Sequence, residues 1–144
     1  MSESSAPDRA EPYVRFYEAM SQDSLSQLPD LVAHDVRFVD PFNDVRGAAA
    51  LQRVMLKTLH DLPGHRFTVT HRAWDGDTCL MRWLFEAEAK GGLKLSFAGM
   101  SELTFDSEGK VACHVDHWDA GKEFYEKLPL LGSLLRTIRR RLAV

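Results

Sequence analysis

Between residues 66 and 118 the sequence contains four consecutive strand-like stretches: RFTVTHRAW (66–74), TCLMRWLFEAEA (78–89), LKLSFAGMSELTF (93–105) and KVACHVDHW (110–118). Each linking segment contains glycine, as Asp75-Gly76, Gly91-Gly92 or Ser107-Glu108-Gly109, and such segments are strong hairpin signals. Consecutive hairpins predict an antiparallel meander. Because strands of up to about a dozen residues must bend in a small domain, we expect a bend or bulge at Gly99.

The segments around the meander have helical patterns. Residues 12–20 and 48–59 each place apolar residues on one helical face, and Ser24 with Gln27 has the form of a capping box that begins a short helix. A strand is expected at Val36–Val39. After the meander, residues 121–142 form an amphipathic helical pattern, which Pro129 and Gly132 should divide.

This order of elements predicts an α+β fold. We expect a cone-shaped barrel, made of a curved antiparallel sheet with helices packed on its concave face and a pocket between them. Residues 12–144 would form this single domain, including the C-terminal amphipathic helix. Residues 1–11 are rich in Ser, Ala, Pro and acidic residues, and we predict that they are disordered.

Composition limits the classes of function. The chain has 144 residues and a formal net charge of −3, so the overall charge does not favour nucleic acid. Cys79 and Cys113 stand alone in apolar stretches, which is typical of buried reduced thiols. There is no secretory signal and no apolar run long enough to cross a bilayer. We therefore expect a cytoplasmic protein.

Three short motifs carry a resemblance to a known family. They are Phe38-Val39-Asp40-Pro41 followed by Gly47, the turn Gly109-Lys110-Val111, and Val115-Asp116-His117-Trp118-Asp119. With the order of elements from about Tyr13 to Asp119, they resemble the nuclear transport factor two-like superfamily. This superfamily includes ketosteroid isomerases, limonene epoxide hydrolase and polyketide cyclase-like proteins.

The resemblance implies roles for particular positions. The general base of ketosteroid isomerases falls on Asp40. Their two oxyanion donors, a tyrosine and a protonated aspartate, fall on Phe16 and Ser101, with Tyr17 one place away from the first. The donor pair is therefore not reproduced, and the resemblance specifies the fold better than the reaction.

The last strand carries the other chemical groups. Because side chains alternate along a strand, His114, Asp116 and Trp118 share one face, and the resemblance favours this face as the cavity wall. His114 and His117 point to opposite faces, so we expect no metal site here. The predicted catalytic residues are Asp40, Asp116 and His114, and the predicted pocket residues are Tyr17, Phe16, Trp118, Ser101, Phe97 and Trp83.

Two charged residues, Arg82 and Glu86, interrupt an apolar strand of the expected cone wall. In residues 78–89 the apolar positions alternate with Arg82 and Glu86, which places Arg82 on the outer side of the sheet. If a bulge reversed this phase, Arg82 would join the two aspartates, in an arrangement similar to that of limonene epoxide hydrolase.

The sequence alone is compatible with two functions. The first is binding of a small, mostly apolar molecule with acid/base chemistry of isomerase or hydrolase type, which needs no cofactor because the sequence contains no phosphate-binding glycine loop. The second is a non-catalytic module in which Asp116 is only a paired buried carboxylate, and the pocket and the terminal helix bind a ligand or a protein.

We also expect association with other surfaces. A homodimer would form through the outer face of the sheet. The terminal helix would pack across the mouth of the cone or on a partner subunit, and its basic amphipathic pattern also fits an anionic membrane surface.

Overall fold

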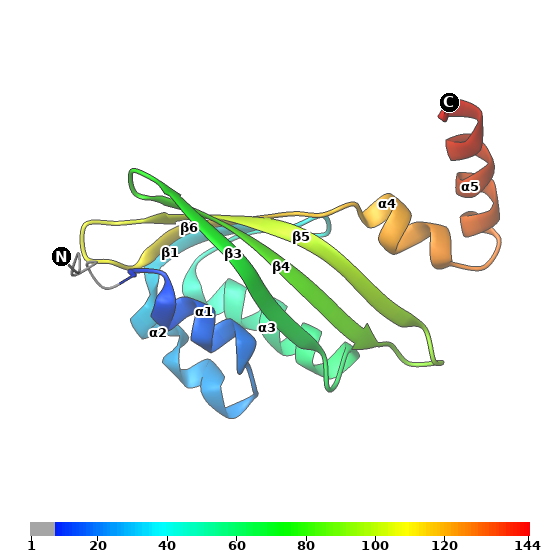
Figure 1. The fold of residues 1–144 in the computed structure, drawn as a ribbon. Helices are drawn as coiled ribbons and strands as arrows, with labels where there is room; N and C mark the ends of the chain where they lie inside the picture. The colour runs from blue at the N-terminus through cyan, green and yellow to red at the C-terminus, as the bar shows by residue number, and fades with distance from the viewer. Residues whose placement is uncertain (1–7) are drawn as a thin grey trace.

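The computed structural model describes residues 8–144, in which helices cover one face of a curved, unclosed sheet (Figure 1). The helices are α1 (Glu11–Glu18), α2 (Leu28–Leu31), α3 (Ala48–Asp61), α4 (Ala120–Glu123) and α5 (Leu131–Leu142), with short 3-10 helices η1 (Asp23–Gln27) and η2 (Tyr125–Lys127). The strands are β1 (Val32–Val39), β2 (Asp44–Arg46), β3 (Arg66–Asp75), β4 (Thr78–Glu88), β5 (Lys94–Phe105) and β6 (Val111–His117). The predicted α+β fold is confirmed.

The sheet has the order β2-β1-β6-β5-β4-β3. The four strands of the meander pair antiparallel, as their hairpins predict. The expectation of a wholly antiparallel sheet was wrong at one place, because β1 pairs with β6 in parallel. A parallel pair needs a crossover connection, and here α3 and three strands of the meander lie between the two partners.

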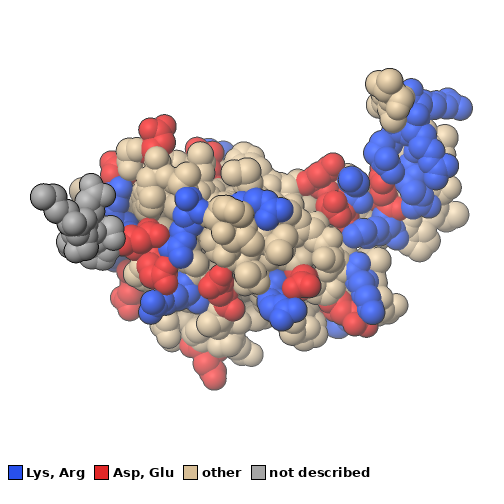
Figure 2. Space-filling view, viewed as in Figure 1, with Lys and Arg blue, Asp and Glu red and all other residues tan. Residues whose placement is uncertain are grey.

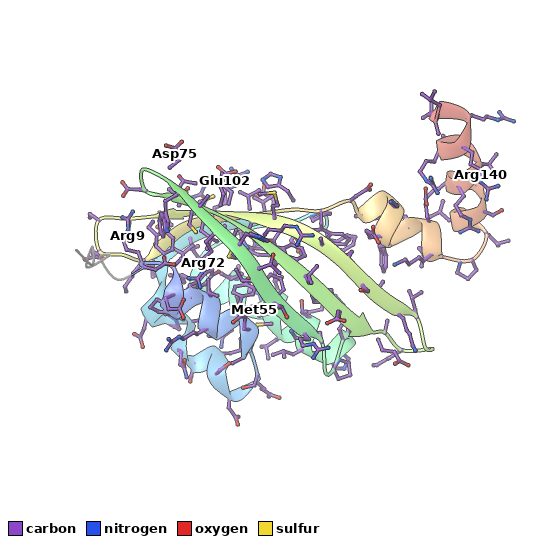
Figure 3. All side chains as sticks on the ribbon, viewed as in Figure 1. Arg9, Met55, Arg72, Asp75, Glu102 and Arg140 are labelled. Carbon is purple, nitrogen blue, oxygen red and sulfur yellow. The ribbon has the colours of Figure 1, made fainter. Side chains whose placement is uncertain are left out.

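Alternation along β4 determines which side chains reach the core. Cys79, Met81 and Trp83 are buried. Arg82, which lies between two of them, and Leu84, which follows Trp83, are exposed. The predicted phase of this strand is therefore confirmed, and the reversed phase that would bring Arg82 to the aspartates does not occur. The side chains on the two faces are shown in Figure 3, where Met55 of α3 lies on the side that the helices cover.

Gly99 has a different role from the predicted bend. The pairing of β4 with β5 runs without a register shift through the Trp83–Gly99 pair. A Cβ atom at Gly99 would overlap the indole of Trp83, lying 2.8 Å from its Cζ3 atom and closer still to its Cη2 atom. Glycine is therefore needed so that the Trp83 ring can lie flat on the neighbouring strand. The register shifts lie elsewhere, in β3 between Val69 and His71 among other places.

Residues 8–11 make defined contacts with the rest of the protein. Arg72 of β3 pairs with Asp8 at 2.6 Å and with Glu11 at 2.7 Å, and Ala10 is fully buried. The predicted disorder of residues 1–11 was therefore wrong for residues 8–11, and residues 1–7 lie outside the described part of the chain. The predicted cap at Ser24 was also wrong, since its hydroxyl donates to the carbonyl of Ser21 from inside η1.

The C-terminal segment is divided at Pro129, as predicted, but not at Gly132, which lies inside α5. It runs through α4 and η2 and ends in α5, which stands beyond the end of the sheet and contacts mainly η2 (Figure 1). The expectation that this helix packs across the mouth of the cone was wrong. Within residues 8–144, no helix is long and apolar enough to cross a membrane.

Candidate functional site

A cavity of about 720 Å³ lies between the covered face of the sheet and α3. This volume is in the range of small-molecule sites, and most of the lining is apolar and aromatic. The two aspartates expected in the site, Asp40 and Asp116, both belong to the lining. The polar groups in an otherwise apolar wall are the features that would orient a ligand.

Asp116 ends a chain of buried hydrogen bonds that begins on α1. The hydroxyl of Tyr13 lies 2.9 Å from Nδ1 of His114, and Nε2 of His114 lies 2.7 Å from Oδ1 of Asp116. The His114 side chain is 0% exposed and that of Asp116 is 15% exposed. Because unpaired buried polar groups are costly, these bonds fix the imidazole and the carboxylate relative to each other.

A second chain of bonds reaches the same oxygen. The indole Nε1 of Trp83 donates to Oγ of Ser101 at 2.8 Å, and the hydroxyl of Ser101 donates to Oδ1 of Asp116. Oδ1 therefore accepts from both Ser101 and His114, while Oδ2 accepts from no described residue. Within the described chain every fully buried side-chain oxygen has a partner, so Oδ2 is accessible. One oxygen of Asp116 is held and the other is open to the cavity.

The protons along the Tyr13–His114–Asp116 chain can be assigned from chemistry. A carboxylate oxygen accepts, so Nε2 of His114 donates to Oδ1 of Asp116, and in the tautomer that carries its hydrogen on Nε2 the other ring nitrogen, Nδ1, accepts from the Tyr13 hydroxyl. Burial raises the pKa of Tyr13 above its ordinary value, and the nearby Asp116 charge acts in the same direction. The pKa of Tyr17 is raised mainly by burial as well. Both phenols therefore stay protonated near neutral pH.

This shift in pKa predicts a loss of stability in alkali. A phenol in the unfolded chain loses its proton near pH 10, whereas Tyr13 and Tyr17 in the folded protein hold theirs to higher pH. The unfolded state then binds fewer protons, so the free energy of unfolding falls as pH rises above about 10, by up to about 1.4 kcal/mol per pH unit for each tyrosine. Urea unfolding at a series of pH values measures the slope. Tyr13→Phe should make it shallower, and an unchanged slope would contradict the assignment.

Asp40 lies at the cavity wall, but the Asp40–Asn43 turn occupies its carboxylate. Oδ1 accepts from the backbone N–H groups of Phe42 and Asn43 at 2.8 and 2.7 Å, and the Asn43 amide donates to both oxygens at 3.0 and 3.1 Å. These bonds are those of an aspartate that stabilises a turn. They leave Asp40 less available to a ligand than Asp116.

The structure brings most of the predicted pocket residues together. Tyr17, Trp83, Phe97 and Trp118 line the cavity, and the rings of Phe97 and Trp118 stack with centroids 4.5 Å apart. Ser101 lies behind the wall, bonded to Asp116.

Three of the residues that the sequence analysis discussed, Phe16, His117 and Arg82, lie away from the cavity. Phe16 does not belong to the lining, because its ring packs in the core beside Tyr13, so its placement in the pocket was wrong. His117 is 62% exposed on the opposite face from His114, beside Glu102. Arg82 is also on that outer face, where it donates to Thr70. Among the described residues, no group of three His, Cys, Asp or Glu side chains is placed to hold a metal ion.

An aromatic cluster at the edge of the cavity was missed from the sequence. Phe42 contacts the rings of Trp118, Phe124 and Tyr125 at centroid distances of 5.5, 5.5 and 6.1 Å. All four rings line the cavity. Phe42 lies in the loop after β1 and Phe124 lies beside η2, so no local pattern connects them. The missed Tyr13–His114 bond likewise joins residues 101 positions apart.

Comparison with solved structures places this architecture among known folds. The chain is similar to an NTF2-like protein of unknown function from Exiguobacterium, with 16% identity, 78% of this chain and 98% of that chain covered, and a TM-score of 0.68. It is similar to a protein with a ketosteroid isomerase-like fold from Catenulispora acidiphila in complex with trimethylamine, with 15% identity, coverage of 82% and 90%, and a TM-score of 0.69. A third similar structure is the LEH-like epoxide hydrolase of M. tuberculosis, with 14% identity, coverage of 91% and 89%, and a TM-score of 0.65.

At such low identities these similarities establish the fold alone. No match is found among curated proteins. The family comparison gives the more specific result, since the model of the SnoaL-like domain matches residues 13–114, from Tyr13 of α1 to His114 of β6. The chain therefore belongs to the SnoaL-like domain family.

Proposed function

We propose that this chain binds a small, mainly apolar molecule in the cavity and that Asp116 exchanges a proton with it as a general base. The open Oδ2 of Asp116, in an apolar wall and beside a fully held Oδ1, is the observation that carries the proposal. A base in such surroundings is close to its substrate and competes with little water. The proposed proton transfer needs no cofactor.

The residues around Asp116 would have different roles. His114 and Ser101 hold Oδ1 and so position the carboxylate, and His114 is too deeply buried to meet a ligand itself. Trp118 and Phe97 offer stacked aromatic surface to a flat or cyclic apolar molecule. Asp40, which the resemblance places as the base, would instead stabilise the turn that carries Phe42.

Proton exchange at carbon tests this role of Asp116 without knowledge of the substrate. A panel of enolisable cyclic ketones in deuterated water is followed by NMR, with the exchange rate at the carbon next to the carbonyl as the readout. Wild-type protein should accelerate exchange for at least one ketone, and Asp116→Asn should lower that acceleration by about 10²–10⁴.

Asp40→Asn and Glu102→Gln are the matched comparisons, and both should keep most of the acceleration. If the exchange persists in Asp116→Asn but is lost in Asp40→Asn, the general base is Asp40 and not Asp116. If no ketone in the panel exchanges faster, Asp116→Asn is tested instead against water activation, with strained epoxides as probes and diol formation as the readout.

A non-catalytic binding module is the second candidate. It is favoured by the pairing of Asp116 with His114 and Ser101, since those bonds by themselves satisfy a buried carboxylate. Native mass spectrometry of the purified protein would then detect a retained apolar ligand, while Asp116→Asn would change neither ligand retention nor any exchange rate.

We also propose that the chain forms a homodimer through the outer face of the sheet. Leu80 and Leu84 of β4 and Met100 of β5 are apolar and exposed on that face. Sedimentation should give twice 16.3 kDa for the wild type, and Leu84→Glu with Met100→Glu should give a monomer because charges would be buried at the interface. A wild-type mass near 16.3 kDa at micromolar concentration would refute the dimer.

A further inference from the structure

The helix α5 is attached to the rest of the protein through its polar side. Nη1 of Arg136 donates to the carbonyl of Glu126, and Nε of Arg139 pairs with Oε1 of Glu126 at 2.6 Å. Gly132 lies directly against the same carbonyl, and a Cβ atom there would overlap it. These three residues share one side of the helix. Glu126 of η2 is buried by this contact.

The apolar side of α5 is left uncovered. Leu131, Leu134, Ile138 and Leu142 recur every three or four residues, so they form one stripe along the helix. All four are exposed, Leu134 by 58% and Leu142 by 81%, and the preceding Leu130 is also exposed. A helix of a water-soluble body normally buries such a stripe and exposes its charges. In α5 the stripe is exposed as well as the charges.

The charge of this segment is opposite to that of the body. Residues 127–144 contain five of the 18 Lys and Arg residues and none of the 21 Asp and Glu residues, a net charge of +5. Residues 1–126 contain the other 13 cations and all 21 acids, a net charge of −8. Figure 2 shows the blue side chains gathered over α5, beyond the mixed surface of the body. Arg140, labelled in Figure 3, lies on the part of α5 away from the sheet.

We propose that α5 binds an anionic lipid surface, with the stripe of Leu131, Leu134, Ile138 and Leu142 inserted at the interface. Helices that lie in a membrane interface combine an exposed apolar stripe with Lys and Arg on the polar side. On a helical projection Arg141 flanks the stripe on one side, so its long side chain can extend to lipid phosphates while the leucines enter the acyl boundary. Arg139, on the other flank, stays paired with Glu126. Because α5 stands beyond the sheet, the acidic body can remain away from the surface.

The charge pattern also decides between a lipid surface and a second copy of this chain. The acidic body of another copy would attract the arginines of α5. Among the described residues that acidic surface offers no apolar patch to cover the stripe, however. The exposed apolar residues of the sheet, Leu80, Leu84 and Met100, lie on its outer face, where they form the proposed dimer interface. A lipid surface accepts cations and an apolar stripe together.

The segment that holds α5 also contributes to the cavity. η2, which holds α5 through Glu126, also carries Tyr125 of the cavity lining. The proposal concerns α5 alone, however, and its test does not depend on any activity of Asp116.

Vesicle sedimentation of the full chain tests the proposal. Vesicles of pure phosphatidylcholine are compared with vesicles of three parts phosphatidylcholine and one part phosphatidylglycerol. Wild-type protein should partition at least about ten-fold more strongly to the anionic vesicles, and 0.5 M salt should remove most of that preference.

Two variants separate the apolar and the charged contributions. Leu134→Ser with Ile138→Ser removes half of the stripe, and Arg140→Glu with Arg141→Glu reverses two charges that make no bond to any described residue. Each pair should lower binding to anionic vesicles by about ten-fold or more. Arg53→Glu with Lys94→Glu changes the net charge equally on the body and should leave binding within about two-fold of wild type.

Two kinds of result would contradict the proposal that α5 binds a lipid surface. Equal binding of wild type and both α5 variants to anionic vesicles, or no binding by the wild type, would overturn the proposal. If the wild type ignores vesicles and Leu134→Ser with Ile138→Ser lowers its sedimentation mass, α5 binds a second copy instead and the proposal is wrong. Thermal unfolding of each variant verifies that the body has kept its fold.

Discussion

Replacement of His114 with alanine is expected to lower the free energy of unfolding by about 3–5 kcal/mol. His114 is fully buried, and its ring nitrogens bond to Tyr13 on one side and Asp116 on the other. Alanine would leave a cavity and also two polar groups without their partner, and both effects oppose folding. Urea unfolding followed by circular dichroism measures the change.

His117→Ala is the matched control for this experiment. His117 lies three residues further along the same segment, but it is exposed, and its ion pair with Glu102 at 3.5 Å is exposed too. Its replacement should change the free energy of unfolding by less than about 0.5 kcal/mol. Equal effects of the two replacements would mean that the Tyr13–His114–Asp116 chain does not exist in the folded protein.

Replacement of Gly99 with alanine is expected to destabilise the fold by about 1–3 kcal/mol, although it adds one methyl group. The new Cβ atom would overlap the indole of Trp83, which is 2% exposed, so the ring would have to leave its present position. If the ring moves, its bond to Ser101 is lost, and with it one of the contacts that hold Asp116. Thermal or urea unfolding gives the stability.

A second replacement tests the cause of this effect. Trp83→Phe shortens the ring, so the double variant of Gly99→Ala with Trp83→Phe should lose less than the sum of the two single variants. Additive losses of stability would show that the methyl group added by Gly99→Ala clashes with a group other than the Trp83 ring. Ser96→Ala, on the exposed side of β5, should have almost no effect.

The local parts of the fold were predictable from the sequence. Gly76, Gly92 and Gly109 mark the ends of strands whose alternation then gives the buried face, as at Met81 and Trp83. Non-local pairing had no such signal, which is why the parallel pairing of β1 with β6 was missed. Gly99 illustrates the same limit, since a glycine within a strand fits a bend as well as an indole on the neighbouring strand.

The sequence predicted part of the cavity lining but not the hydrogen bonds behind it. Alternation and the family resemblance placed Asp116 and Trp118 at the cavity, and both line it. Phe16 and Tyr17 differ by one position on a helix, about 100° of rotation, so alignment with relatives could not separate the core residue from the lining residue. In the same way, the pattern of α5 gives an apolar stripe, but only the contact of Gly132 with η2 determines which side stays exposed.

A crystal structure of the protein soaked with 2-naphthol tests the role of Asp116 most directly, because the flat aromatic alcohol resembles the enol of a cyclic ketone. We predict that the naphthol lies against Trp118 and Phe97, with its hydroxyl donating to Oδ2 of Asp116 at about 2.5–3.0 Å. The bonds of Oδ1 to His114 and Ser101 should remain. A naphthol bound in the cavity with its hydroxyl on Asp40, or an Oδ2 turned away and bonded within the protein, would contradict the proposal.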